Sequence, residues 1–124
     1  MTVSNEFLNA LEGICPVRRK EAVAALDPGF YPDNLKAGVV AHPGSISEIQ
    51  AIVELCRIHR VSIVPQGGRT GLAGAAASLP GQLIVDLRAM NQIENMDPVS
   101  GTVTVQAGIT LQEVQDACAV HGLT

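Results

Sequence analysis

The sequence predicts an α/β (α+β) fold, a parallel βαβ core with an added β-hairpin, and three observations lead to it. Two short β-prone runs at residues 39–41 and 61–64 flank a stretch with helical apolar spacing, and a third run follows at 83–85. A connection of that length between two strands is most simply a right-handed parallel crossover. Hydrophobic residues form 47% of the 124 residues and charged residues only 16%, so the chain can bury one core.

Residues 1–37 are expected to form a helical arm that is peripheral to this core. Apolar residues recur there at helical spacing, namely Phe7, Leu8, Leu11 and Ile14. Cys15-Pro16 ends this first helix, and a second helix is predicted over 17–26. Its basic residues are Arg18, Arg19 and Lys20, which we interpret as a solvated helix face. Turn-forming residues follow in 27–34.

The regular core is expected over residues 38–124. Ser45 and Glu48 have the spacing of a capping box, which predicts a helix that ends near His59. Two β-prone runs at 93–96 and 102–106 are separated by turn chemistry and predict the hairpin. A second capping box predicts a final helix, which begins after Thr110 and runs into His121-Gly122.

Composition and charge argue against several functions. The formal net charge is −4 and only three aromatic residues are present, two Phe and one Tyr, which disfavours nucleic-acid binding. The cysteines, Cys15, Cys56 and Cys118, form no CxxC pair and are expected to be buried thiols of a reducing compartment. The sequence shows no 18-residue apolar run and no signal-peptide pattern, so no membrane span and a cytoplasmic location are expected.

A glycine-rich loop over residues 66–74 follows the second β-prone run. Its four glycines are expected to permit positive φ angles and to gather backbone N–H groups into a nest that suits phosphate oxygens. Arg69 can add a charge-assisted hydrogen bond and Thr70 a hydroxyl donor, so a pyrophosphate is the expected ligand. The alternative is a glycine-rich surface loop whose small residues only permit tight packing.

Two common nucleotide-binding motifs do not fit this loop. A Walker A motif requires a lysine, and no lysine occurs after Lys36. The Rossmann fingerprint requires GxGxxG at the start of a helix, whereas Gly68, Gly71 and Gly74 recur at every third position. Nucleoside triphosphate hydrolysis and nicotinamide dinucleotide binding are therefore disfavoured.

Several motifs in order resemble the first part of the FAD-binding domain of FAD-linked oxidases, the vanillyl-alcohol-oxidase or PCMH type. They are Pro43-Gly44-Ser45, the run Val64-Pro65-x-Gly67-Gly68-x-Thr70-Gly71, Asp86-Leu87-x-x-Met90-Asn91 and Val105-x-Ala107-Gly108. The resemblance covers about 38–124, and the nearest branch is that of D-lactate dehydrogenase and the glycolate oxidase flavin subunit. It implies the first lobe of a two-lobed FAD-binding domain.

The resemblance also implies the cofactor and the residues that hold it. FAD would be bound through its pyrophosphate by Pro65, Gln66, Gly67, Gly68, Arg69, Thr70, Gly71 and Leu72. Relatives often have another residue at Arg69 and a glycine at Ala75. Asp86 and Asn91 are expected to organise strand ends and turns. The implied parent enzyme oxidises a small 2-hydroxy acid.

Members of this family are several hundred residues long, so the chain resembles an N-terminal fragment without a second lobe or a substrate domain. Its histidines and carboxylates form no catalytic arrangement in the sequence, and no catalytic or metal-binding residue is predicted. One alternative is a non-catalytic module that folds and self-associates through its exposed lobe surface without FAD. Another is a phosphate-binding domain without a flavin.

Overall fold

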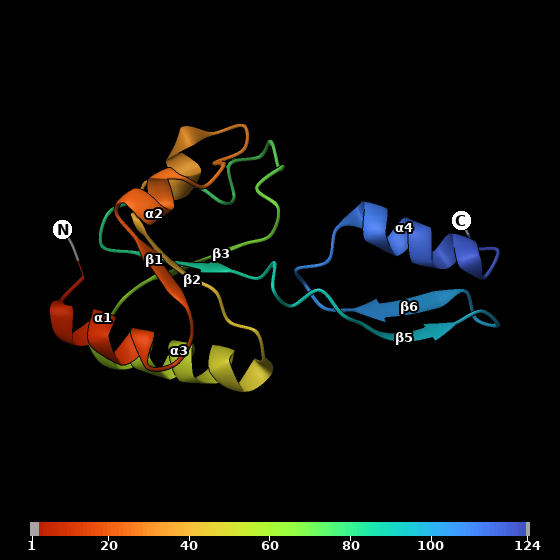
Figure 1. Cartoon of the computed structure of the whole chain (residues 1–124), viewed down its shortest axis with the longest axis horizontal. Coiled ribbons are helices and arrows are strands. Elements are labelled where there is room, and N and C mark those ends of the chain that lie inside the picture. The colour runs from red at the N-terminus through yellow and green to blue at the C-terminus, as the bar shows by residue number, and fades with distance from the viewer. Residues whose placement is uncertain (1–2, 124) are drawn as a thin grey trace.

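The computed structural model describes residues 3–123, and its larger sheet, of four strands, lies among the helices of the N-terminal part (Figure 1). Its strands, in spatial order, are β1 (Val17–Arg19), β2 (Val39–Ala41), β4 (Leu83–Asp86) and β3 (Ile63–Gln66). β2 and β3 both run parallel to β4, and β1 runs antiparallel to β2. The predicted parallel βαβ unit is confirmed, with β4 inserted between its two strands.

Helices cover both faces of this sheet. α1 (Asn5–Glu12) and α3 (Ile46–His59) lie side by side on one face, and the short α2 (Glu21–Ala24) and the 3-10 helix η1 (Pro32–Leu35) lie on the other (Figure 1). Side chains alternate along a strand, so Ala41 packs with the α1 and α3 side chains while Val40 packs with Val23 of α2.

The N-terminal segment contributes directly to the core. Phe7 and Leu11 of α1 are completely buried, in the same cluster as Ile52 of α3 and Leu83 of β4. The expected helical arm over residues 1–37 therefore shares its buried side chains with the sheet.

The helix predicted over residues 17–26 is wrong in its first part. Val17–Arg19 is a strand, whose residues pair with Ala41–Val39 at the edge of the sheet. Lys20 then has a φ of 52°, which turns the chain into the four residues of α2. Arg18 and Arg19 therefore stand on an edge strand and Lys20 at the turn after it, and Arg19 forms a 3.0 Å ion pair with Glu12.

The predicted hairpin and final helix are present as β5 (Ile93–Asp97), β6 (Thr102–Val105) and α4 (Leu111–Val120). The hairpin forms a sheet of its own, and with α4 it projects away from the four-stranded sheet (Figure 1). The reciprocal capping box at Thr110 is formed. At Ser45 only half of the expected box forms, because the Glu48 carboxylate accepts from the Ser45 hydroxyl instead of the backbone N–H.

Two of the three cysteines are buried, as expected, and Cys118 is half-buried. Burial raises the pKa of the Cys56 thiol to about 11, so this thiol stays protonated at neutral pH. No helix within residues 3–123 combines the length and the apolar character needed to cross a membrane.

Candidate cofactor-binding site

The glycine-rich loop leaves β3 at its carboxyl end and surrounds a hollow of about 390 Å³. All eight predicted site residues line this hollow, from Pro65 to Leu72, together with Ala73, Ala75 and Ala76. Ligands of open α/β sheets bind beyond the carboxyl ends of parallel strands. The position of the loop is therefore that of a ligand site.

At three positions of the loop, neither the backbone conformation nor contacts within the chain require glycine. Gly67, Gly68 and Gly71 lie outside the left-handed region, so their backbone conformation does not require glycine. An added Cβ would meet nothing within 4 Å at Gly67 or Gly71, and at Gly68 only the Thr70 methyl group at 3.8 Å. A ligand that lies against the backbone would fill the space that side chains would otherwise take.

The expectation that the glycines supply positive φ angles is mostly wrong. Within the loop only Gly74 adopts one, at 80°, and the other positive φ belongs to Arg69, at 59°. Glycine serves here to keep space open above the backbone, and the left-handed turn is made by a residue with a side chain.

The backbone of this loop offers donors that the protein does not use. Within the described chain, the N–H groups of residues 67–74 donate no hydrogen bond, and the exposed Thr70 hydroxyl has no partner. Residues 65–82 contain no carboxylate, and Arg69 is their only charged side chain. A run of unpaired N–H groups around a hollow that no carboxylate lines favours an anion. These residues fit a pyrophosphate.

The side chain of Gln66 points into the protein and fixes the start of the loop. It is buried, and its Nε2 donates to the carbonyl groups of Asn34 and Ala76. Its Oε1 accepts from Arg69 Nη1 at 3.2 Å. Gln66 thus joins the end of β3 to Arg69 within the loop and to Ala76 just after it. Any contact that it makes with a ligand is through its backbone.

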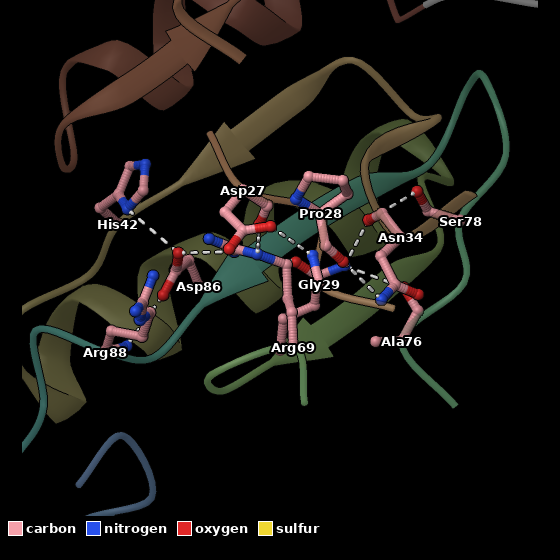
Figure 2. A network of polar contacts seen from close by, with 11 residues as sticks. Asp27, Pro28, Gly29, Asn34, His42, Arg69, Ala76, Ser78, Asp86 and Arg88 are labelled. Atoms are coloured by element: carbon pink, nitrogen blue, oxygen red, sulfur yellow. Dashed lines mark hydrogen bonds and ion pairs between the residues drawn. The ribbon is translucent and has the colours of Figure 1, made fainter. Parts of the chain in front are cut away.

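Arg69 is also turned inward, and Figure 2 shows its contacts. Its Nη1 lies 3.0 Å from Asp86 Oδ2, and its Nε donates to the carbonyl of Asp27 at 2.8 Å. Asp86 ends β4, where its Oδ1 also accepts from the Arg88 N–H at 2.9 Å. Asp86 therefore organises the strand end, in agreement with the sequence interpretation, and the Arg69 charge is directed at a protein carboxylate.

A clamp formed by residues 27–34 holds the outside of the loop. The Tyr31 hydroxyl donates to the carbonyl of Leu72 at 2.6 Å, and the Asp27 carbonyl accepts from Arg69. Gly29 has a φ of 75° and lies so close that a Cβ would be 1.9 Å from the Arg69 oxygen. Sequence reasoning assigned this segment turn chemistry and missed its part in the site. The Asp-Pro-Gly turn was the one available signal.

His42 lies beside this network, with Nδ1 3.8 Å from Asp86 Oδ2 and with a buried Nε2 that has no partner within residues 3–123. Burial lowers the pKa of His42 below its ordinary 6.5. The Asp86 carboxylate opposes this, whereas Arg18, Arg69 and Arg88 add to it. The other histidines lie elsewhere: His59 packs edge-on against Phe7, and His121 caps α4.

The lowered pKa of His42 predicts a pH dependence of stability. The unfolded chain binds a proton more tightly than the folded chain, so the stabilisation is complete above 6.5 and is lost as the pH falls towards the folded pKa. We expect the denaturant concentration at the unfolding midpoint to decrease when the pH is lowered from about 7.5 to about 5.5. The decrease should be smaller in His42→Gln. His121→Gln is the control and should behave like the unchanged chain. Equal falls in all three proteins would contradict this assignment.

Comparison with known proteins identifies the family to which this chain belongs. Residues 37–124 match the family model described as FAD binding domain. The chain belongs to this FAD binding domain family. Its cofactor is FAD, which confirms the cofactor expected from the sequence.

The relatives of this chain include proteins named D-2-hydroxyglutarate dehydrogenase and D-lactate dehydrogenase. It is 42% identical over 84 residues to the D-2-hydroxyglutarate dehydrogenase of Xanthomonas citri pv. viticola, covering 68% of this chain and 18% of that protein. It is 33% identical over 85 residues to the D-lactate dehydrogenase of Anaerostipes hadrus, again 68% of this chain and 18% of the relative. The chain thus spans less than a fifth of these relatives.

A solved structure confirms the predicted fold. The structure of p-cresol methylhydroxylase with substrate bound matches 98% of this chain and 26% of its own, with a TM-score of 0.79 and 22% sequence identity. The α/β fold of a PCMH-type FAD-binding domain, with a parallel βαβ core and an added hairpin, is therefore the observed one. Within residues 3–123, no group of His, Cys, Asp or Glu is arranged to hold a metal ion.

Proposed function

We propose that this chain is the pyrophosphate-holding, N-terminal part of the FAD site in a flavin-dependent oxidoreductase that acts on a 2-hydroxy acid of the D-lactate or glycolate type. The observation that carries the proposal is the run of unpaired N–H groups over 67–73, which lines a hollow without carboxylates. The names of the relatives support the substrate class. The cytoplasmic location expected from the sequence stays a prediction.

In this proposal the loop backbone binds and orients the cofactor. The N–H groups of Gly67, Gly68 and Gly71 and the Thr70 hydroxyl would donate to the pyrophosphate oxygens, where charge-assisted hydrogen bonds are strongest. FAD, when bound, supplies the acceptor for the hydride that leaves carbon 2 of the substrate as the hydroxyl proton is lost and the 2-oxo acid forms. The residues that would bind the substrate and take that proton would lie in the rest of the parent enzyme.

Titration of the chain with FAD by calorimetry tests this proposal. We expect stoichiometric binding, and we expect Gly68→Asp to weaken it at least about tenfold because a negative charge would face the pyrophosphate. Gly68→Asn adds nearly the same volume without the charge and should retain more affinity than the aspartate variant. A folded chain that fails to bind FAD, or aspartate and asparagine variants that bind as well as the unchanged chain, would contradict it.

A second candidate function is a non-catalytic module that self-associates. The observation that favours it is α4, in which no residue is fully buried and Leu111 and Val120 are 72% and 83% exposed. Val99 at the hairpin turn is 98% exposed. Exposed apolar surface of this kind favours association. A colourless chain that sediments as an oligomer and does not bind FAD would support this candidate over the first.

A further inference from the structure

A buried ion pair joins the middle of the glycine-rich loop to the sheet. Arg69 Nη1 and Asp86 Oδ2 are 3.0 Å apart, and the two side chains are only 1% and 3% exposed. The guanidinium has two further acceptors. One is Gln66 Oε1, and the other is the carbonyl of Asp27 (Figure 2). A buried charge is tolerated only when it is paired and hydrogen-bonded, and these three acceptors satisfy that condition.

The acceptors come from three separate parts of the fold. Gln66 ends β3, Asp86 ends β4, and the two are directly paired in the sheet. Asp27 begins the clamp of residues 27–34. The planar guanidinium presents donors in a fixed fork, so it fixes the position of Arg69 relative to both strand ends and the clamp.

The backbone at Arg69 is strained, and the side chain is what holds it. Arg69 has a φ of 59°, which brings the Cβ of any residue other than glycine too close to the following carbonyl oxygen. Glycines, which would adopt this conformation freely, stand at Gly68 and Gly71 instead, with other backbone conformations. The left-handed turn therefore persists at Arg69 because its guanidinium contacts hold it there, and this turn sets the direction of the neighbouring N–H groups.

We propose that Arg69, through its pair with Asp86, is a positioning residue that holds the glycine-rich loop ready for the FAD pyrophosphate, and that its charge is used inside the protein instead of on the phosphates. This inference rests on the function proposed above. A positioning role differs from a direct contact with the phosphates, for which the Arg69 guanidinium would have to leave Asp86 and bind the ligand. The two arrangements predict opposite effects of removing the Asp86 charge.

A double-mutant cycle separates the two arrangements. FAD affinity is measured for the unchanged chain, for Arg69→Met, for Asp86→Asn and for the double variant. We expect each single variant to bind FAD at least about tenfold more weakly. Without the ion pair, one or two backbone residues of the loop are no longer held in the free protein, and FAD binding must then supply the free energy that orders them. We expect the double variant to be no weaker than either single one, since both remove the same attachment. Affinity that is unchanged or higher in Asp86→Asn would overturn the inference.

Arg60→Met is the matched control. Arg60 also has a left-handed backbone, with a φ of 56°, but its side chain is exposed and makes no hydrogen bond within the described residues. Removal of this charge should change FAD affinity less than about twofold. Where Arg69→Met fails to fold, Arg69→Lys replaces it. Lysine keeps the charge but lacks the planar fork, so positioning predicts weaker binding and a direct phosphate contact predicts binding close to that of the unchanged chain.

A readout without FAD reports on the loop alone. Leu72 of the loop is exposed, so thermolysin cleavage beside it measures how firmly the loop is held. Cleavage should be faster in Arg69→Met and Asp86→Asn than in the unchanged chain and Arg60→Met, and equal rates in all four would overturn the inference. Failure of the folded, unchanged chain to bind FAD would instead contradict the proposed function, whatever the cleavage rates.

Discussion

Replacement of Gly108 with alanine is expected to lower the free energy of unfolding by about 3 kcal/mol or more. A Cβ there would lie 1.6 Å from the carbonyl oxygen of Leu87 and 2.8 Å from Arg88 Cα. These are backbone atoms just after the buried strand β4, and they have no free rotation by which to move away. The hydrogen bond of 2.9 Å from the Gly108 N–H to the Met90 carbonyl would be lost with the displacement.

Denaturant unfolding followed by circular dichroism measures this effect, and amide exchange at Gly108 reports the local loss. Gly44→Ala is the matched control, because its Cβ would meet only the flexible end of Glu48, at 3.9 Å. That variant should stay within about 0.5 kcal/mol of the unchanged chain. If Gly108→Ala were as stable as Gly44→Ala, the close approach of the Leu87 and Arg88 backbone would not make glycine necessary at position 108.

Gly29→Ala is expected to damage both stability and FAD binding. Its φ of 75° disfavours any residue with a Cβ, and that Cβ would lie 1.9 Å from the Arg69 carbonyl oxygen. The clamp would therefore push the glycine-rich loop outward at the residue that makes its left-handed turn.

Gly38→Ala isolates the contact from the backbone strain. Gly38 has nearly the same φ, 77°, but nothing lies within 4 Å of the added carbon. The strain alone should cost Gly38→Ala about 1–2 kcal/mol of unfolding free energy, and Gly29→Ala should cost about 2 kcal/mol more. Calorimetric titration should show weakened FAD binding only in Gly29→Ala. Equal losses of stability in the two variants would contradict a role for the contact.

Elements from residue 38 onward could be predicted because their signals are local. The run Val39–Ala41 is apolar and β-prone, and Thr110 and Glu113 form the capping box that their spacing indicates. The strand expected at 61–64 instead spans Ile63–Gln66, because pairing with β4 extends it through Pro65 and the polar Gln66. An apolar run alone does not indicate that extension.

The parts that could not be predicted depend on distant partners. Val17–Arg19 has one apolar residue and looks helical in isolation, and only its pairing with β2 makes it a strand. In the same way, the loop composition pointed to the segment that lines the hollow, but nothing near Arg69 in the sequence shows that its guanidinium meets Asp86 and Asp27. The spacing of residue types along the sequence indicates which residues are neighbours on one helix or strand. It does not indicate which residues from different elements come into contact in the fold.

The position of β4 between β2 and β3 has a consequence for biosynthesis. Val40 and Val64 both pair with Ile84, which the ribosome adds well after either of them. Domains fold as units during synthesis, and distant pairings form late. We therefore expect the sheet to stay open along its middle until residue 86 has emerged. Until then β2 and β3 of the nascent chain each have an unpaired edge where β4 will later bind. Unpaired strand edges of this kind favour aggregation.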